Sequence, residues 1–133
     1  MTTFHVPGTP APQGSKNAYV RGGRAVLVES SKKVPAWRAA VAEAATQHCG
    51  ELIDGPVDLT IEFVLPRPKS LPKRITHMVR KPDLDKLVRS TCDALSGTAY
   101  VDDNRVHHLT ATKRYAHPGE PTGAHITIRE TRS

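Results

Sequence analysis

Five of the seven aspartates of the chain fall within one short stretch, and their spacing could support catalysis. They are Asp83, Asp85, Asp93, Asp102 and Asp103. Carboxylate oxygens are hard ligands that suit Mg²⁺ and Mn²⁺, and Mg²⁺ commonly takes one or two carboxylates together with water and a substrate phosphate. Aspartates are also common at helix starts and in turns, where their role is structural. Spacing alone leaves both interpretations open.

The rest of the chain is basic. Its 133 residues include 19 Lys and Arg against 13 Asp and Glu, a net charge of +6. This balance favours polyanionic partners. An acidic cluster on a cationic chain is what a metal-dependent enzyme acting on nucleic-acid phosphates needs. If the aspartates are metal ligands, we expect Mg²⁺ as cofactor, with Mn²⁺ as its substitute.

Cysteine and histidine spacing argues against other classes of site. Cys49 and Cys92 are far apart, and the seven histidines lack the spacing of a zinc site, so we expect two reduced thiols. No apolar run approaches the ~20 residues of a membrane span, and no signal-peptide core is visible. We expect a cytoplasmic protein with no membrane partner, made of one small domain over residues 1–133.

Positive charge is concentrated in two stretches that lack acids. One precedes Glu29 and surrounds Gly22-Gly23, a pair typical of a hairpin turn. The other runs from Pro66 to Pro82, too rich in proline for a regular helix and long for a connection. Each could be a solvated loop, but we favour contact with DNA phosphates, with the second loop ordering on the substrate. The DNA-binding candidates are Lys16, Arg21, Arg24, Lys69, Lys73, Arg74, Arg80 and Lys81.

Hydrophobic periodicity predicts an α+β (mixed α/β) fold of about five strands in one mixed sheet, with two helices packed on it. The strands are expected at residues 3–7, 25–28, 57–65, 106–115 and 124–130. A helix is expected from about Pro35 to Cys49, with Trp37, Ala40, Val41, Ala44 and His48 on one face. A second helix begins with Asp83 as its N-cap and buries Leu84, Leu87, Val88, Thr91 and Leu95. Asp85 then lies in its first turn, where the helix dipole stabilises anions.

Three motifs in the acidic stretch resemble the RusA family of Holliday-junction resolvases, small endodeoxyribonucleases common in phage and prophage genomes. They are Lys81-Pro-Asp-Leu-Asp-Lys-Leu87, Asp93-Ala-Leu-Ser-Gly97 and Ala99-Tyr-Val-Asp-Asp103. The resemblance includes the N-terminal Pro10-Ala-Pro-Gln-Gly-Ser-Lys16 and extends to about Ile128. It implies a RusA-like fold, a C₂ homodimer and paired symmetric nicks in four-way or branched DNA.

The resemblance also implies roles for individual residues. The essential carboxylates of the family correspond to Asp83, Asp85 and Asp103, with Asp102 as an adjacent metal ligand or an acceptor behind it. Lys86 stands where the family commonly has asparagine, and Arg89 stands where it has a functional lysine. Arginine does not act as a general acid at neutral pH, so we expect Arg89 to keep only an electrostatic role. Asp93 is interpreted as a structural cap or salt-bridge partner.

Two other functions fit the same residues. In a non-catalytic branched-DNA-binding module the aspartates would be caps, and only the basic loops would carry function. In a general Mg²⁺-dependent nuclease there would be no selectivity for junctions. Cleavage of a four-way junction and of a matched duplex distinguishes these possibilities.

Overall fold

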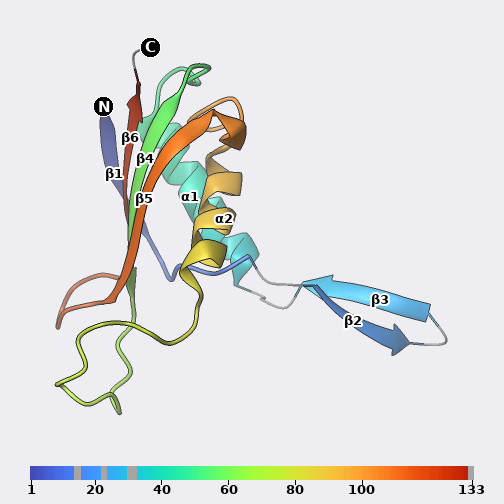
Figure 1. Cartoon of the computed structure of the whole chain (residues 1–133), viewed down its shortest axis with the longest axis vertical. Coiled ribbons are helices and arrows are strands. Elements are labelled where there is room, and N and C mark those ends of the chain that lie inside the picture. The colour runs from blue at the N-terminus through green and yellow to red at the C-terminus, as the bar shows by residue number, and fades with distance from the viewer. Residues whose placement is uncertain (14–15, 22–23, 30–32, 132–133) are drawn as a thin grey trace.

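The structure, a computed structural model, describes residues 1–13, 16–21, 24–29 and 33–131, with the backbone alone described in the second and third ranges. Its centre is a four-stranded mixed sheet in the order β1-β6-β4-β5. Helices α1 and α2 cover one face of this sheet, as the sequence predicts (Figure 1). The elements are β1 (Thr2–Pro7), α1 (Val34–His48), β4 (Val57–Leu65), α2 (Leu84–Leu95), β5 (Val106–Tyr115) and β6 (Gly123–Glu130).

The expectation of about five strands in one sheet is wrong by one strand. Residues 25–28 belong to β3 (Arg24–Glu29), which pairs antiparallel with β2 (Lys16–Arg21) in a separate two-stranded sheet. After β1 the chain leaves the main sheet and meets α2, where Gln13 N donates to the carbonyl of Lys86 at 2.9 Å. The predicted hairpin is therefore confirmed by its strand pairing, whereas its Gly22-Gly23 turn lies outside the described residues.

Strand β4 is the centre of the core. Leu59, Ile61 and Phe63 are buried on the face that meets the helices, while Thr60 is exposed. This alternation is what the sequence predicts for a sheet covered on one side. The neighbouring β5 runs parallel to β4, so the chain crosses back through α2 between them. The crossover carries the start of α2 to the end of the sheet where β4 finishes (Figure 1).

The two helices pack against each other as well as against the sheet. Trp37 is buried on α1, as predicted, and its indole N–H donates to Thr91 Oγ on α2 at 3.2 Å. His48, predicted on the same face, is exposed at the end of α1, and its ring stacks on the buried Phe4 with ring centroids 5.5 Å apart. In the described ranges, no helix has both the length and the apolar character needed to cross a bilayer.

Residues 66–82 form no helix or strand, as expected, but hydrogen bonds hold their path. Arg67, near the start of this loop, donates from its two terminal nitrogens to the carbonyls of Ile75 and Pro72, at 2.9 and 2.8 Å. Its guanidinium also lies 5.4 Å from the ring centroid of Tyr115. The loop is thus tied to itself and to the end of β5.

Candidate active site

Asp83 and Asp85 lie together at the start of α2, as the sequence predicts. Asp83 occupies the N-cap position with extended backbone angles, but its carboxylate accepts no hydrogen bond from the helix. Instead it lies 3.8 Å from the ammonium of Lys86, a loose and exposed ion pair. Asp85 is exposed in the first turn and has no hydrogen bond or ion pair with the residues that the structure describes. Both carboxylates are therefore open to solvent, where the helix dipole favours negative charge.

Asp102 and Asp103 lie beyond the opposite end of α2, in the connection to β5. Asp102 caps the short 3₁₀ helix η1 (Asp103–Arg105) by accepting a hydrogen bond from Asn104 N at 3.2 Å. Asp103 is exposed, and among the described residues its carboxylate has no hydrogen-bond or ion-pair partner. Asp102 thus has a structural hydrogen bond, whereas the carboxylate of Asp103 is open to a ligand from solvent.

Asp103 and Asp93 both lie close enough to Cys92 to influence its ionisation. Burial is the main reason that the pKa of the Cys92 thiol rises to about 11, and the negative charges of Asp103 and Asp93 add to the rise. Asp93 is itself half-buried near the C-terminal end of α2. Cys49 and Cys92 are free thiols, as predicted, and burial also raises the pKa of Cys49.

The acids therefore form two groups along α2. The helix has 12 residues, which at the usual rise corresponds to about 18 Å between its ends. In the described part of the chain, no three His, Cys, Asp or Glu side chains are placed to hold one metal ion. A single chain does not gather the predicted set of four aspartates at one point. The pair Asp83 and Asp85 nevertheless fits the preference of Mg²⁺ for one or two carboxylates completed by water and phosphate.

Two cations accompany this acid pair. Lys86 is engaged with Asp83, as described above. Arg89 lies one turn after Asp85, exposed, and pairs with no acid among the described residues. Its guanidinium is therefore free to meet a phosphate. The exposed cations of the loop before α2 add to this positive surface: Lys69, Lys73, Arg74, Arg80 and Lys81.

The backbone leading into Asp83 is fixed by a residue that the sequence analysis missed. Lys113, half-buried on β5, donates from its ammonium to the carbonyls of Arg80 and Pro82 at 2.8 and 2.9 Å. A lysine within an otherwise alternating strand was the only available signal, and it does not reveal partners 33 and 31 residues away. Ser90 was missed for a similar reason. It is fully buried on α2 and donates to the carbonyl of Ala11 at 2.6 Å.

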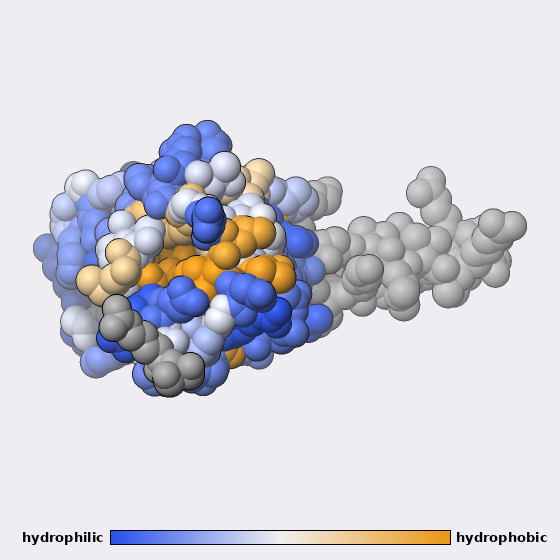
Figure 2. All heavy atoms as spheres, turned by 90° about the horizontal axis from the view of Figure 1, so that it is seen from above, coloured by the Kyte–Doolittle hydropathy of each residue, from blue (hydrophilic) through white to orange (hydrophobic). Residues whose placement is uncertain are grey.

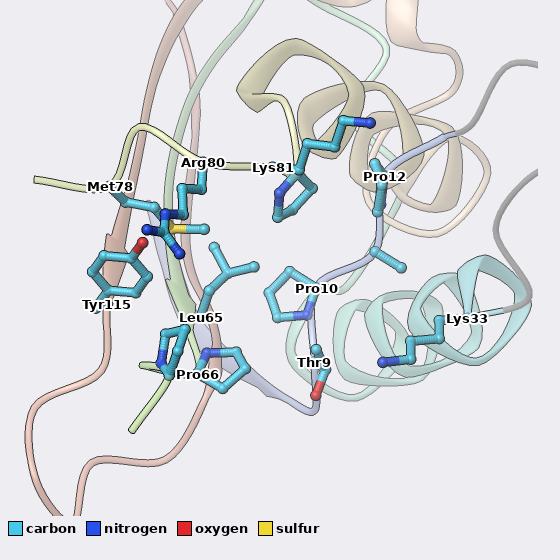
Figure 3. Close-up of a pocket in the computed structure, with 13 residues that line it drawn as sticks. Thr9, Pro10, Pro12, Lys33, Leu65, Pro66, Met78, Arg80, Lys81 and Tyr115 are labelled. Atoms are coloured by element: carbon cyan, nitrogen blue, oxygen red, sulfur yellow. The ribbon is translucent and has the colours of Figure 1, made fainter. Parts of the chain in front are cut away.

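A cavity of about 360 Å³ lies beside the segment that leads into α2. Its walls come from the segment after β1, the end of β4, the loop before α2 and the end of β5, and Figure 3 shows Pro10, Leu65, Met78 and Tyr115 around it. Pro82, the residue before Asp83, also lines it. Sequence patterns gave no indication of this cavity, because its walls are far apart along the chain.

The predicted basic arm lies partly outside what can be described. Lys16 and Arg21 are the end residues of β2, and Arg24 begins β3. Only their backbone is described, so their contact with DNA stays a prediction.

Comparison with known proteins places the chain in a family. A family model described as Endodeoxyribonuclease RusA matches residues 7–129, a range that contains every candidate catalytic residue and the loop before α2. The chain is also similar to the uncharacterized protein YqaN of Bacillus subtilis (strain 168), with 32% identity over 138 residues that cover 96% of this chain and 94% of that protein. The match covers the acid pair, the helix that carries it and the sheet beneath, and the chain belongs to the RusA family of endodeoxyribonucleases.

Proposed function

We propose that the protein resolves Holliday junctions by Mg²⁺-dependent hydrolysis of DNA phosphodiesters. One observation carries the proposal: Asp83 at the N-cap and Asp85 in the first turn of α2 are both exposed, directly after an acid-free basic loop. Negative charge is placed where a cationic surface delivers DNA phosphates. Membership in the RusA family supports the same activity.

Asp83 and Asp85 are proposed as the principal ligands of Mg²⁺, with Asp103 as a third and Asp102 beside it. A bound Mg²⁺ would supply Lewis-acid polarisation of the scissile phosphate. Within one chain Asp103 stands with the second acid group, near Cys92. The hydrogen bond from Asn104 N leaves Asp102 with a cap role in any case.

Arg89 is proposed to stabilise negative charge that develops on the phosphate during cleavage. It has no acidic partner among the described residues, and it lies on the same helix one turn after Asp85. A guanidinium keeps its charge at all relevant pH values, so this role is electrostatic rather than proton transfer. Lys86, whose ammonium lies 3.8 Å from Asp83, is proposed to offset part of the negative charge of the acid pair.

DNA affinity is proposed to come from phosphate contacts of the basic loop and of the β2–β3 arm. The loop cations Lys69, Lys73, Arg74, Arg80 and Lys81 form no ion pairs with the described acids. They are therefore available to replace counterions on the DNA, and junction affinity should fall steeply with salt.

Paired symmetric nicks require two active sites, and we propose that a C₂ homodimer provides them. Two exposed surfaces support self-association. Strand β5 is at the edge of the sheet and exposes Leu109, and unpaired edges are able to take a further strand. The other surface lies at the end that carries the α1–β4 and α2–β5 connections, where Leu52 and Val101 are exposed; Figure 2 shows an apolar area at this end.

The test uses labelled four-way junction and matched linear duplex, each with Mg²⁺ or with EDTA. We expect the junction to be cleaved by paired nicks in Mg²⁺ and to stay uncut in EDTA. Asp83→Asn and Asp85→Asn should each lower cleavage about a hundredfold or more, because an electrostatic contribution to the transition state is lost. Junction binding should persist or tighten, since one negative charge near the phosphates is removed.

Glu43→Gln on α1 is the matched control, because it also turns an exposed carboxylate into an amide. Junction binding without any cleavage would identify a non-catalytic binding module. Equal cutting of junction and duplex would identify a general nuclease. Undiminished cleavage by either aspartate variant would contradict the assignment of the acid pair.

A further inference from the structure

The cavity before Asp83 combines an apolar interior with a basic border. Pro10, Leu65 and Met78 present carbon atoms to it, and Tyr115 adds an aromatic ring. Its volume of about 360 Å³ lies within the size range of sites that bury a small ring system. Water gains few hydrogen bonds from such walls, so a flat, mainly apolar group is the favoured occupant.

The positive charge at the border of the cavity indicates that its occupant carries negative charge. Lys33, Arg80 and Lys81 line it, and no acidic residue does. Figure 3 shows the three basic side chains at separate positions around the hollow. None of them forms an ion pair with an acid in the described ranges. A ring that carries a phosphate satisfies both the walls and the border, whereas an apolar peptide side chain leaves the three cations without partners.

The walls are held in place from two sides. Lys113 binds the carbonyls of Arg80 and Pro82 on one side of the cavity. Ser90 binds the carbonyl of Ala11 on the other, at 2.6 Å. The cavity is therefore formed by fixed backbone rather than by exposed side chains alone, which is typical of preformed ligand sites.

We propose that this cavity receives one nucleobase of branched DNA, displaced from its stack beside the scissile phosphate. The inference rests on the proposed function and deepens it. Pro82 lines the cavity and is bonded to Asp83, so a base in the cavity would lie close to the start of α2, where the acid pair stands. Bases at a branch point are already partly unstacked, which lowers the energy needed to displace one. The cavity would then select where the strand is cut.

The test places the fluorescent base 2-aminopurine, in turn, at each position flanking the crossover of a four-way junction. Full-length protein is added in EDTA, so that binding is observed without cutting. We expect a fluorescence change at one position, and weaker binding, by about tenfold, when that position is abasic. Thr9→Phe, which places an aromatic ring at the exposed wall residue Thr9, should abolish the fluorescence change and the penalty for the abasic site.

Thr3→Phe is the matched control, since Thr3 is also exposed but lies on β1 and does not line the cavity. If Thr9→Phe lowers the thermal unfolding midpoint, Arg80→Gln with Lys81→Gln replaces it, compared with Lys69→Gln and Lys73→Gln from the same loop. Binding and paired cutting with no fluorescence response at any position would overturn the inference and leave the proposed function intact. A position-specific fluorescence response without cleavage in Mg²⁺ would support the inference and overturn the proposed function. Equal effects of both threonine variants would also overturn it.

Discussion

The ammonium of Lys113 lies 2.9 Å from the carbonyl oxygen of Pro82, the residue directly before Asp83. The same ammonium donates to the carbonyl of Arg80 at 2.8 Å, so one side chain of β5 fixes two carbonyls of the approach to α2. The sheet thereby sets the position from which the acid pair projects. Lys113 is a positioning residue, because it acts on Asp83 only through the backbone.

Replacing Lys113 with methionine should impair cleavage more than binding. The methionine keeps the length of the apolar stem but leaves two carbonyls without their donor, so Asp83 moves from its place. A small displacement of a catalytic group can lower the rate about a hundredfold, whereas phosphate contacts elsewhere are unaffected. Single-turnover cleavage and junction affinity measure the two effects separately.

Lys69→Met serves as the comparison, since it removes an exposed loop cation with no such contact. It should weaken binding and leave the single-turnover rate unchanged. Lys113→Arg should recover part of the rate, because arginine can still donate to carbonyls. A Lys113→Met protein that only binds DNA more weakly would show that the residue acts as a phosphate contact.

The parts of the fold that the sequence predicted are those that local pattern determines. Strand β4 (Val57–Leu65) and strand β5 (Val106–Tyr115) have the predicted bounds, because alternation of apolar residues is a property of neighbouring positions. Helix α1 begins and ends within one residue of the prediction, and α2 begins directly after Asp83 as predicted, owing to Pro35 and Asp83 near their starts. The α+β class follows from these elements alone.

What the sequence could not give are relationships between distant segments. The segment after β1 meets α2 through the hydrogen bond from Gln13 N to the carbonyl of Lys86. The burial of Ser90 depends on the carbonyl of Ala11. Each is a tertiary contact that residue type and spacing leave undetermined.

Asp103 and Asp93 provide a test of which acid at the far end of α2 takes part in cleavage. Both influence the Cys92 thiol, but Asp103 is exposed and Asp93 half-buried. If Asp103 is a metal ligand, Asp103→Asn should lower cleavage about a hundredfold and raise the Mg²⁺ concentration needed for half-maximal rate. Asp93→Asn should change neither quantity by more than about twofold, as expected for a residue outside the reaction.

The paired comparison also bears on how the two acid groups relate. A large effect of Asp103→Asn, with cleavage restored by mixing it with an inactive Asp85→Asn protein, would indicate a site shared between two copies. An effect that no mixing restores would indicate that each chain supplies its own set. Identical behaviour of the Asp103 and Asp93 variants would remove Asp103 from the metal site.

Acid should weaken the fold through the pair formed by Arg114 and Glu120. The guanidinium of Arg114 lies 2.7 Å from Glu120 and, together with the hydrogen bond from His117 N, lowers the pKa of that carboxyl from 4.5 to about 2. Because the pKa is depressed in the folded state, the stabilisation is fully present above 4.5 and is lost as the pH falls toward 2. The thermal unfolding midpoint should decline over this range.

Glu120→Gln should unfold at a lower temperature than the unaltered protein at pH 7, and the difference should shrink as the pH falls below 4.5. Asp58 titrates in the same direction, because its hydrogen bond from His108 lowers its pKa, so the difference between the two proteins is the informative quantity. Glu43→Gln, at an exposed site on α1, should show no such pH-dependent difference. A constant difference from pH 7 to pH 3 would contradict a role for the ionised carboxylate.

Arg89 should contribute charge to the reaction and no proton. It is exposed one turn after Asp85 and pairs with none of the described acids, so its guanidinium can approach a phosphate bound at the proposed site. Arg89→Gln should lower the single-turnover rate about a hundredfold, the typical effect of removing one electrostatic contact to a transition state. Arg89→Lys should keep most of the rate at pH 8, but a lysine loses its charge near a pKa of about 10.4. The cleavage rate of Arg89→Lys should therefore fall toward pH 10. The protein with arginine should show no such fall, because its guanidinium stays charged. Matching pH profiles for the two proteins would show that the charge at this position is not used in cleavage.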